Sequence, residues 1–553
     1  MSFLQPAPRL NNPYSHDRVL QNWLRSVFPA SHRPSLTPDL QALARYAMAA
    51  YAEHLITPRQ EPVLTQWDAW GARVDRITLT PTWERGAGIT AQHGLLWSGH
   101  VEDPEGWMRC AQFARVYLYH VASEFYTCPL AMTDGATTVL KASEAPALSE
   151  RALPHFLSHD PEKLWLSGQW MTETPGGSDV SRTETVARQD AQGQWRLYGR
   201  KWFSSAVIGE AAMALARPAG AGPGSSAIGL FYVETRDDNG DWNGLQVQRL
   251  KDKLGTRELP TAEVDLDGLP AWPIGEPKHG VRRIAPMLNI TRTWNSICAM
   301  ATTRRAIALA IDYCHRRQAF GEYLLEQPLH RGTLADLVPE FEAGFHLSFA
   351  VARLLGQVES GCATDTETAV WRILTPLAKL WTGKLAVEIT SECLEAIGGA
   401  SYIEDTGLPQ LLRDAQVYPL WEGTTNVLAL DTLRALGQTG IEPLRQFIEQ
   451  RLRNTDPATA VTIRSPFEAS ARFLEQAAKQ RSHLEAGARG LALTLARTTA
   501  AALLAENSGL ANADPRTGLA LQRFLSHGLD RLPEKYDDAL AEASLLDDNP
   551  SSD

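Results

Sequence analysis

Apolar residues recur at helical spacing in two long parts of the chain, before residue 165 and after residue 280. Near the N-terminus, Leu40, Leu43 and Ala47 repeat every three or four residues, as one face of a helix requires. A strict four-residue spacing later links Leu377, Trp381, Leu385, Ile389 and Cys393. This pattern predicts helices in both parts, and Gly398-Gly399 ends the later one. Cys128-Pro129 interrupts the first part, and we expect a loop to begin there around a buried cysteine.

Between residues 165 and 280 the pattern changes to short apolar runs separated by turn residues. The runs begin at Trp195, Met213, Ile228 and Ala262, and stretches rich in Gly, Pro and Asp separate them. This texture predicts a small β domain between helical ones. We therefore expect an α+β multidomain protein: an N-terminal helical domain (1–164), a central β domain (165–280), a helical bundle (281–440) and an additional C-terminal helical domain (441–553).

Composition narrows the class of protein. With 553 residues, 44% of them hydrophobic, 21% charged and a net charge of -11, the chain resembles a soluble globular protein with several cores. No apolar run is long enough for a membrane span, and Met1 begins no signal-peptide pattern. Six cysteines without a Cys-x-x-Cys pair favour a reducing, cytoplasmic location. His155 and His159 lack a third metal ligand, and no dinucleotide-binding Gly-x-Gly-x-x-Gly follows an early strand.

One carboxylate has the surroundings of a general base. Glu422 lies between Trp421 and Gly423, just before another predicted helix that Thr424 or Thr425 can cap. The positive end of that helix favours the charged form of Glu422, and apolar neighbours favour the neutral form. A carboxyl group balanced in this way is a candidate general base. The buried face and the end of the predicted helix are assigned to Val427, Leu430, Leu433 and Gly437.

Two motifs in the predicted β domain have the features of a cofactor site. The first, Met171-Thr-Glu-Thr-Pro-Gly-Gly-Ser178-Asp179, combines glycines that permit close backbone approach with hydroxyl groups that can form hydrogen bonds. The second, Lys201-Trp-Phe-Ser-Ser205, follows about 25 residues later on a predicted strand. Either motif alone is an ordinary turn or strand, and the pair is more specific.

These motifs, together with residues 398–426, resemble the signature of the acyl-CoA dehydrogenase superfamily. The resemblance implies bound FAD and a catalytic base at Glu422, with Arg292 beside it, that removes the α-proton of a thioester substrate. It also implies that Ser204, or Ser205 as second choice, bonds near the flavin N5 atom. The other flavin contacts implied in the β domain are Met171, Thr172, Gly177, Ser178, Trp202 and Phe203.

A third motif, Arg316-Arg317-Gln-Ala-Phe320-Gly321, resembles the part of this superfamily that contacts the flavin of a neighbouring subunit. Arginine suits that task because its planar fork matches phosphate oxygens. The implied assembly is a homotetramer, a dimer of dimers. One departure is Glu395, where many members carry Gln on the adenine side of the flavin. Further implied flavin contacts are Arg317, Phe320, Gln327, Gly398, Gly399, Trp421, Thr424 and Asn426.

Several details resemble the AidB branch of the superfamily, among them Cys128-Pro-x-x-Met-Thr133 and the extra C-terminal segment. That resemblance implies weak acyl-CoA dehydrogenase activity, a role in the adaptive response to DNA alkylation and binding of double-stranded DNA by the C-terminal domain. Residues 441–535 hold 13 Lys+Arg against 10 Asp+Glu, and residues 536–553 add six acids, so charge alone does not indicate DNA binding. The alternative is a metabolic acyl-CoA dehydrogenase without DNA binding. A nitroalkane oxidase is less consistent, because those enzymes use Asp where Glu422 stands.

Overall fold

The computed structural model describes residues 5–478, 480–533 and 539–546. Six helices build most of the N-terminal part, and the segment between the second and third contains a hairpin of strands β1 (Val63–Trp67) and β2 (Arg73–Thr78). The helices are α1 (Arg18–Ser26), α2 (Arg33–His54), α3 (Pro81–His93), α4 (Met108–His120), α5 (Thr127–Lys141) and α6 (Pro146–Phe156). The sequence pattern predicted the helices but not the hairpin, whose alternation is partly exposed.

Seven strands follow and pair into a barrel. Their pairing closes through β4, β5, β9, β7 and β6, with β3 added beside β6 and β8 beside β9. The hairpin β1–β2 lies next to β8, where Gln66 and Arg73 donate to the carbonyl oxygen of Val247 at 3.0 and 2.8 Å. The strands are β3 (Ser167–Trp170), β4 (Val186–Gln189), β5 (Trp195–Ser205), β6 (Ala211–Pro218), β7 (Gly229–Glu234), β8 (Leu245–Leu250) and β9 (Thr261–Pro273).

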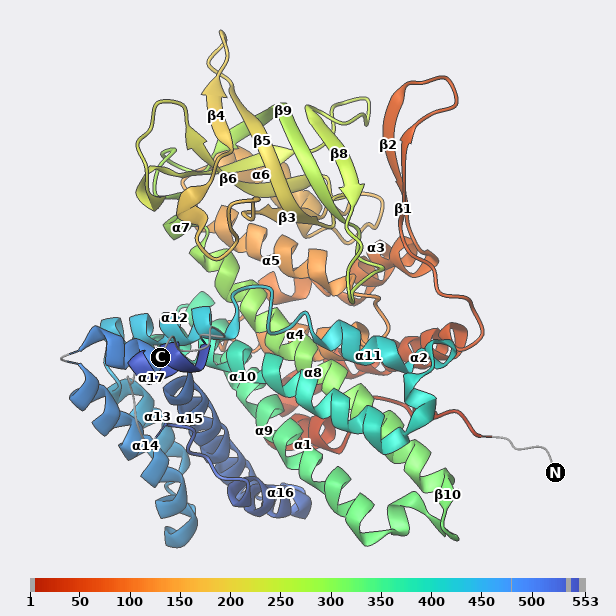
Figure 1. The fold of residues 1–553 in the computed structure, drawn as a ribbon, viewed down its shortest axis with the longest axis vertical. Coiled ribbons are helices and arrows are strands. Elements are labelled where there is room, and N and C mark those ends of the chain that lie inside the picture. The colour runs from red at the N-terminus through yellow and green to blue at the C-terminus, as the bar shows by residue number, and fades with distance from the viewer. Residues whose placement is uncertain (1–4, 479, 534–538, 547–553) are drawn as a thin grey trace, which may run out of the picture.

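The rest of the chain is helical and lies below the barrel in Figure 1. A short hairpin joins the first long helix of the bundle to the second. Its strands, β10 (Gln318–Ala319) and β11 (Glu322–Tyr323), have two residues each. The bundle contains α7 (Gly280–Arg283), α8 (Ala285–Arg316), α9 (Pro328–Glu359), α10 (Asp365–Ile397), α11 (Leu408–Ala415) and α12 (Thr425–Thr439). The C-terminal part contains α13 (Glu442–Arg451), α14 (Pro457–Ala477), α15 (Arg481–Ser508), α16 (Pro515–Ser526) and α17 (Ala539–Leu546).

Two hydrophobic cores result from this arrangement. The smaller fills the barrel with alanines of β6 and larger residues such as Phe231 and Leu197. The larger core is continuous from the N-terminal helices through the bundle into the C-terminal helices. Helix α15 is buried over most of its length, and its Arg497 forms a bidentate ion pair with Glu340 of α9 at 2.8 and 2.9 Å. The C-terminal helices are therefore packed into the bundle. Among the helices of the described ranges, none is long and apolar enough to cross a membrane.

Two local predictions are wrong. Cys128 and Pro129 lie in the first turn of α5, where proline is tolerated because its missing N–H has no intrahelical partner there. The helix after Glu422 begins after Thr424, as predicted, but it runs past Gly437 to Thr439 and ends at Gly440 with φ +70°. Its buried face holds Leu428, Ala429, Asp431, Thr432, Ala435 and Leu436, whereas Leu430 is exposed.

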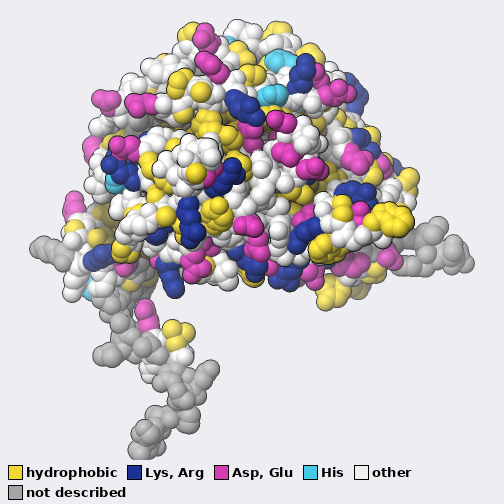
Figure 2. Space-filling model, turned by 90° about the horizontal axis from the view of Figure 1, so that it is seen from above, with side chains coloured by type: hydrophobic (Ala, Val, Ile, Leu, Met, Phe, Trp, Pro, Cys, Tyr) yellow, Lys and Arg dark blue, Asp and Glu magenta, His cyan; other side chains and the backbone are white. Residues whose placement is uncertain are grey.

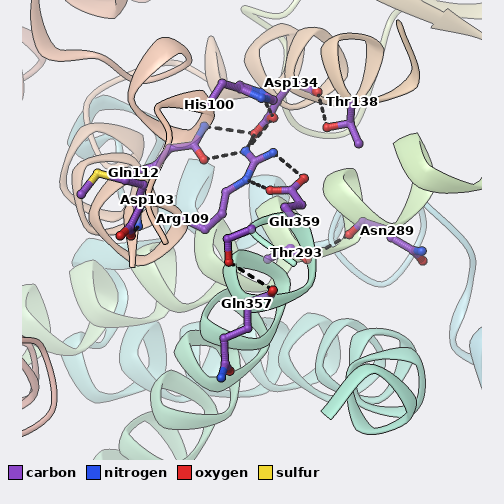
Figure 3. A network of polar contacts seen from close by, with 12 residues as sticks. His100, Asp103, Arg109, Gln112, Asp134, Thr138, Asn289, Thr293, Gln357 and Glu359 are labelled. Atoms are coloured by element: carbon purple, nitrogen blue, oxygen red, sulfur yellow. Dashed lines mark hydrogen bonds and ion pairs between the residues drawn. The ribbon is translucent and has the colours of Figure 1, made fainter. Parts of the chain in front are cut away.

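A buried ion cluster joins the N-terminal helices to the bundle (Figure 3). Arg109 of α4 binds Asp134 of α5 at 2.8 Å and Glu359 at the end of α9. His100 and Trp294 add hydrogen bonds to the Asp134 carboxylate at 2.8 and 2.7 Å. Burial favours the neutral forms, but the neighbouring Arg109 and His100 hold the pKa of Asp134 well below its usual range. The cluster therefore fixes how α4, α5 and α9 pack.

Replacing Arg109 by Met should destabilise the protein by about 3–5 kcal/mol, because it leaves the carboxylates of Asp134 and Glu359 without their cation. The matched control is Arg200→Met, which removes the exposed ion pair with Asp265 on the barrel and should cost less than about 1 kcal/mol. Thermal unfolding of the two variants measures the difference. Equal shifts would show that the cluster is not a determinant of stability.

Candidate active site

Glu422 occupies a strained turn between α11 and α12. Its backbone has φ +56° and that of Gly423 has φ +101°, and the left-handed region is costly for a residue with a side chain. The turn is held at both carbonyl groups. The Glu422 carbonyl accepts from Arg292 Nε at 3.3 Å, and the Gly423 carbonyl accepts from Lys379 Nζ at 2.5 Å. Two cations from α8 and α10 thus stabilise a backbone conformation that the local sequence disfavours.

Both basic side chains lie in the interior, and Asp431 of α12 holds Arg292 in place. Asp431 binds Arg292 at 2.7 Å and Arg372 of α10 at 2.8 Å. Burial acts to raise the pKa of Asp431, but the adjacent guanidinium groups of Arg292 and Arg372 lower it overall. Lys379 is fully buried, and burial lowers its pKa to about 7 although the nearby Glu422 charge acts in the opposite direction. The turn therefore packs against interior side chains that are mostly basic.

The carboxylate of Glu422 points away from these basic side chains. Its Oε2 atom accepts from Thr291 Oγ1 of α8 at 2.6 Å, and its Oε1 atom lies 3.5 Å from Gln169 Nε2 of β3. The side chain is half-buried at the junction of the barrel with the bundle. One strong donated hydrogen bond orients the group and leaves lone pairs that can accept a proton from a bound molecule.

An aromatic cluster closes one side of this junction. Trp421 donates its indole N–H to Asn295 of α8 and packs edge-on against Phe125, with ring centroids 6.1 Å apart. Phe125 also packs against Tyr418 at 6.0 Å. These rings form an apolar wall directly beside the carboxylate, as a site that binds an apolar chain requires.

The barrel side of the junction fits a flavin. A buried ion pair between Glu173 and Lys201, 2.6 Å apart, holds the loop that follows β3 against β5. A Cβ atom at Gly177 would meet the side chain of Thr172, so glycine is needed for this loop to fold closely. The Ser204 hydroxyl and Gln169 Oε1 are buried and have no hydrogen-bond partner within the described ranges, whereas Ser205 bonds to Thr261 at 3.1 Å. Unpaired buried polar groups of this kind suit a bound cofactor.

The predicted site residues fall into two groups. Glu422, Arg292, Trp421 and Thr424 lie together on the bundle side. Met171, Thr172 and Trp202 lie on the barrel side, close to β3, whose Gln169 is 3.5 Å from Glu422. Arg317, Phe320, Gln327, Gly398 and Gly399 lie at the other end of α8, which rises about 37 Å between Arg292 and Arg317. The two groups of one chain therefore cannot contact the same flavin ring.

The distant group includes an exposed hairpin turn. Phe320 is 100% exposed and, with Gly321, forms the turn of the β10–β11 hairpin with φ of +56° and +89°. Gln327 Nε2 donates to the Ala319 carbonyl at 2.8 Å and stiffens this hairpin. An aromatic side chain held in full exposure on a strained turn is consistent with a subunit interface.

Sequence reasoning missed Gln169, Lys379 and Asp431 and gave no role to Thr291. Gln169 lies on β3, two residues before Met171, and its Nε2 atom is 3.5 Å from the Met171 sulfur, so the motif that begins at Met171 ended just short of it. Lys379 is a lone charge in an apolar stretch of α10, which is the usual signal of a buried, functional charge. Asp431 lies on the buried face of α12, and that face was assigned to other residues.

The fold and this junction are those of a flavin-dependent oxidoreductase. Four family descriptions match the chain: "Acyl-CoA dehydrogenase, middle domain" (168–269), "Acyl-CoA dehydrogenase, C-terminal domain" (278–437), "Adaptive response protein AidB N-terminal domain" (5–162) and "Acyl-CoA dehydrogenase 11 C-terminal domain-like" (447–549). The chain belongs to the acyl-CoA dehydrogenase family, whose members are FAD-dependent oxidoreductases that act on CH–CH groups.

Relatives of known structure and annotation agree with this assignment. The chain is 39% identical to acyl-CoA dehydrogenase family member 11 of Caenorhabditis elegans, over 92% of this chain and 87% of that protein. It is 33% identical to AidB of Escherichia coli, over 69% of this chain and 71% of that protein. A structure of C. elegans ACDH-11 in complex with C11-CoA superposes with a TM-score of 0.95 at 36% identity, covering 100% of this chain and 97% of that one.

Replacing Lys379 by Met should alter how stability depends on pH. Below about pH 7 Lys379 is protonated in both folded and unfolded states, and the cost of burying its charge is fully present. Above pH 7 only the unfolded state stays protonated, up to its ordinary pKa of about 10.4, so the wild-type protein gains stability as pH rises. The variant lacks this gain. The unfolding temperature of the wild type relative to the variant should therefore increase between about pH 6.5 and 8.5. A control variant, Lys384→Met on the partly exposed side of α10, should show no such trend.

Proposed function

We propose that this protein catalyses the α,β-dehydrogenation of an acyl-CoA, with Glu422 as the base that removes the α-proton. The observation that carries the proposal is the placement of the Glu422 carboxylate, oriented by Thr291 against an apolar wall at the barrel–bundle junction. The C11-CoA complex of the C. elegans relative supports an acyl-CoA as substrate. A half-buried, hydrogen-bonded carboxylate of this kind has the position and chemistry of a general base.

Each part of the site has a task in this reaction. Trp421 and Phe125 give the acyl chain an apolar surface and exclude water from the α-carbon. Arg292 and Lys379 hold the turn, so that the Glu422 oxygens keep one orientation while a proton is transferred to them. Bound FAD supplies the acceptor for the hydride that leaves the β-carbon. The residues that would hold it are Thr172, Gly177, Ser178, Trp202 and Ser204, with Ser204 favoured over Ser205 because its hydroxyl is unpaired.

We also propose the homotetramer that the sequence resemblance implied. The support is the pair of site groups, which are too far apart to serve one flavin within one chain. In a tetramer, Arg317, Phe320 and Gln327 of one subunit would complete the flavin site of its neighbour. Binding and assembly would then be linked, because each stabilises the other.

A second candidate function, binding of duplex DNA as part of an adaptive response to alkylation, is supported by the match to the AidB N-terminal domain and the 33% identity to AidB. Charge weighs against it. Most arginines of the C-terminal helices are already in ion pairs with carboxylates, namely Arg445, Arg451, Arg464, Arg481, Arg497, Arg516 and Arg523. On the barrel end of the molecule, acidic and basic side chains are interspersed (Figure 2). Residues 536–538 and 547–553 of the acidic tail lie outside the described residues.

Glu422→Gln should retain FAD and the assembly but lose acyl-CoA-dependent flavin reduction by at least about a thousandfold, because an amide cannot accept the α-proton. Anaerobic stopped-flow absorbance with a panel of acyl-CoAs measures this directly. Glu404→Gln, an exposed carboxylate paired with Arg413, is the matched control and should reduce flavin at the wild-type rate. Reduction of the Glu422 variant at the wild-type rate would mean that another group is the base.

Phe320→Asp should lower both flavin content and particle size on dilution, because the exposed ring would no longer bury itself against a neighbouring subunit. Light scattering with simultaneous flavin absorbance should give four chains with about one FAD each for the wild type. Leu519→Asp on α16, also exposed, should leave both unchanged. A flavin-saturated wild-type monomer would refute the shared site.

If the C-terminal helices bind duplex DNA, Arg472→Glu and Arg489→Glu together should abolish a gel shift seen at low salt, since both side chains are exposed on these helices. The wild-type shift should weaken steeply with added salt and show no sequence preference. Point variants are preferable to truncation at residue 441, which would expose the shared hydrophobic core. If the wild type gives no shift at low salt, DNA binding is refuted and only the acyl-CoA dehydrogenase function remains as a proposal.

A further inference from the structure

A polar cavity lies behind the aromatic wall of the candidate active site. It has a volume of ≈ 80 Å³ and is lined by Tyr51, His120, Phe125, Thr302, Arg305 and Asp414, among others. Phe125 belongs to both places: it lines the cavity and packs against Trp421, the residue before Glu422. Phe125 is therefore shared by the cavity and the aromatic wall.

Arg305 of α8 is the cation of this cavity. Its guanidinium donates to the Val121 carbonyl and lies 5.3 Å from the ring of Tyr51. Its Nε–H is buried and has no hydrogen-bond partner, and the guanidinium forms no ion pair with a carboxylate, within the described ranges. A buried donor without an acceptor is costly, so a group that enters the cavity with an acceptor oxygen relieves that cost.

The other polar groups of the cavity differ in what they can offer. His120, Thr302 and the Tyr418 hydroxyl bond to one another at 2.6 to 3.2 Å and are satisfied. Asp414 and Glu124 are carboxyl groups on the cavity wall, and burial raises the pKa of both. Glu124 already accepts from Thr80 Oγ1 at 2.7 Å and Asp414 from the Thr256 N–H at 2.6 Å, and His54, Thr82 and Gln410 complete the polar lining. The cavity thus presents an open donor at Arg305 beside two carboxyl groups whose remaining lone pairs can accept.

The backbone beside the cavity is strained. Glu124 and Phe125 are consecutive residues with φ of +46° and +61°, and neither is glycine. Two such residues in succession persist only where the surroundings enforce them, and they are concentrated at functional sites. The strain places one carboxyl group on the cavity wall and the aromatic ring between the cavity and Trp421.

We propose that this cavity receives the far end of the substrate's acyl chain, and that Arg305 selects a chain that ends in a hydroxyl group. The inference rests on the proposed acyl-CoA dehydrogenase function. A hydroxyl oxygen accepts from Arg305 Nε–H, and the hydroxyl proton is donated to Glu124 or Asp414, so both needs of the cavity are met. A methyl terminus would leave the Arg305 donor unpaired.

The same geometry sets a length requirement. Thr291, which bonds to Glu422, and Arg305 are 14 residues apart on α8, a rise of about 21 Å. Only a long acyl chain extends so far from a thioester held at Glu422. Shorter chains leave the cavity to water, which has room there and satisfies Arg305 equally well for either terminus. The preference for a hydroxyl end therefore arises only above a threshold chain length.

The test uses full-length Glu422→Gln holoprotein, which binds thioesters without turning them over, and isothermal titration calorimetry. The ligands are saturated acyl-CoAs of increasing length, each paired with its ω-hydroxyacyl-CoA counterpart. We expect equal affinities for short pairs and, at long lengths, at least about tenfold tighter binding of the hydroxylated member. Arg305→Met in the same background should remove this preference. Arg304→Met, whose arginine bonds instead to the His16 carbonyl and Asp17, should keep it.

The outcomes separate the two proposals. If no acyl-CoA binds, the proposed function fails and this inference fails with it. If acyl-CoAs bind but the hydroxyl gives no advantage at any length, or the advantage survives Arg305→Met, the inference is overturned and the proposed function stands. The parent Glu422→Gln measurement needs no Arg305 variant, so the inference can be refuted even if Arg305→Met does not fold.

Discussion

The active site depends on a strained turn whose carbonyl groups are bound by two basic side chains. Glu422 and Gly423 have left-handed backbone conformations, and their carbonyl groups bind Arg292 and Lys379 from two different long helices. Asp431 on the following helix fixes Arg292 in turn. Because α8, α10 and α12 all meet at this point, the packing of the bundle determines how the Glu422 carboxylate is oriented. Only that packing offsets the free-energy cost of the left-handed backbone in this turn.

Different parts of α8 contact different sites, and the position of this turn at one end of the helix explains why. The first half of α8 carries Thr291 and Arg292, which contact Glu422, and Asn295, which contacts Trp421. Its middle carries Arg305 to the polar cavity, and Arg317 and Phe320 follow its far end. Helix α8 thus extends from Glu422, past the site proposed for the end of the acyl chain, to the proposed contact with a neighbouring subunit's flavin. The C-terminal helices share the core of the bundle, so they reinforce this frame whatever else they do.

The fold class was predictable because hydrophobic periodicity changes clearly between helical and β parts, and Glu422 was recognisable from its motif. Failures arose where tertiary contacts overrode local pattern. The buried face of α12 includes Asp431, which apolar periodicity excludes, and the partly exposed β1–β2 hairpin gives no strong alternation. Lys379 and Gln169 come near Glu422 only through folding, at separations of 43 and 253 residues in the chain. The lone charge of Lys379 in an apolar stretch indicates burial, but only the folded structure shows that either residue lies beside Glu422.

The central claim is that Glu422 removes the α-proton of an acyl-CoA, and an isotope effect tests it most directly. Anaerobic flavin reduction by the wild-type holoprotein should be compared for an acyl-CoA with hydrogen and with deuterium at the α-carbon. If proton abstraction by Glu422 limits the chemical step, reduction of flavin should be several-fold slower with the deuterated substrate, and the effect should be largest at saturating substrate. Equal rates, with flavin reduction still complete, would contradict the claim that α-proton abstraction limits flavin reduction at this site.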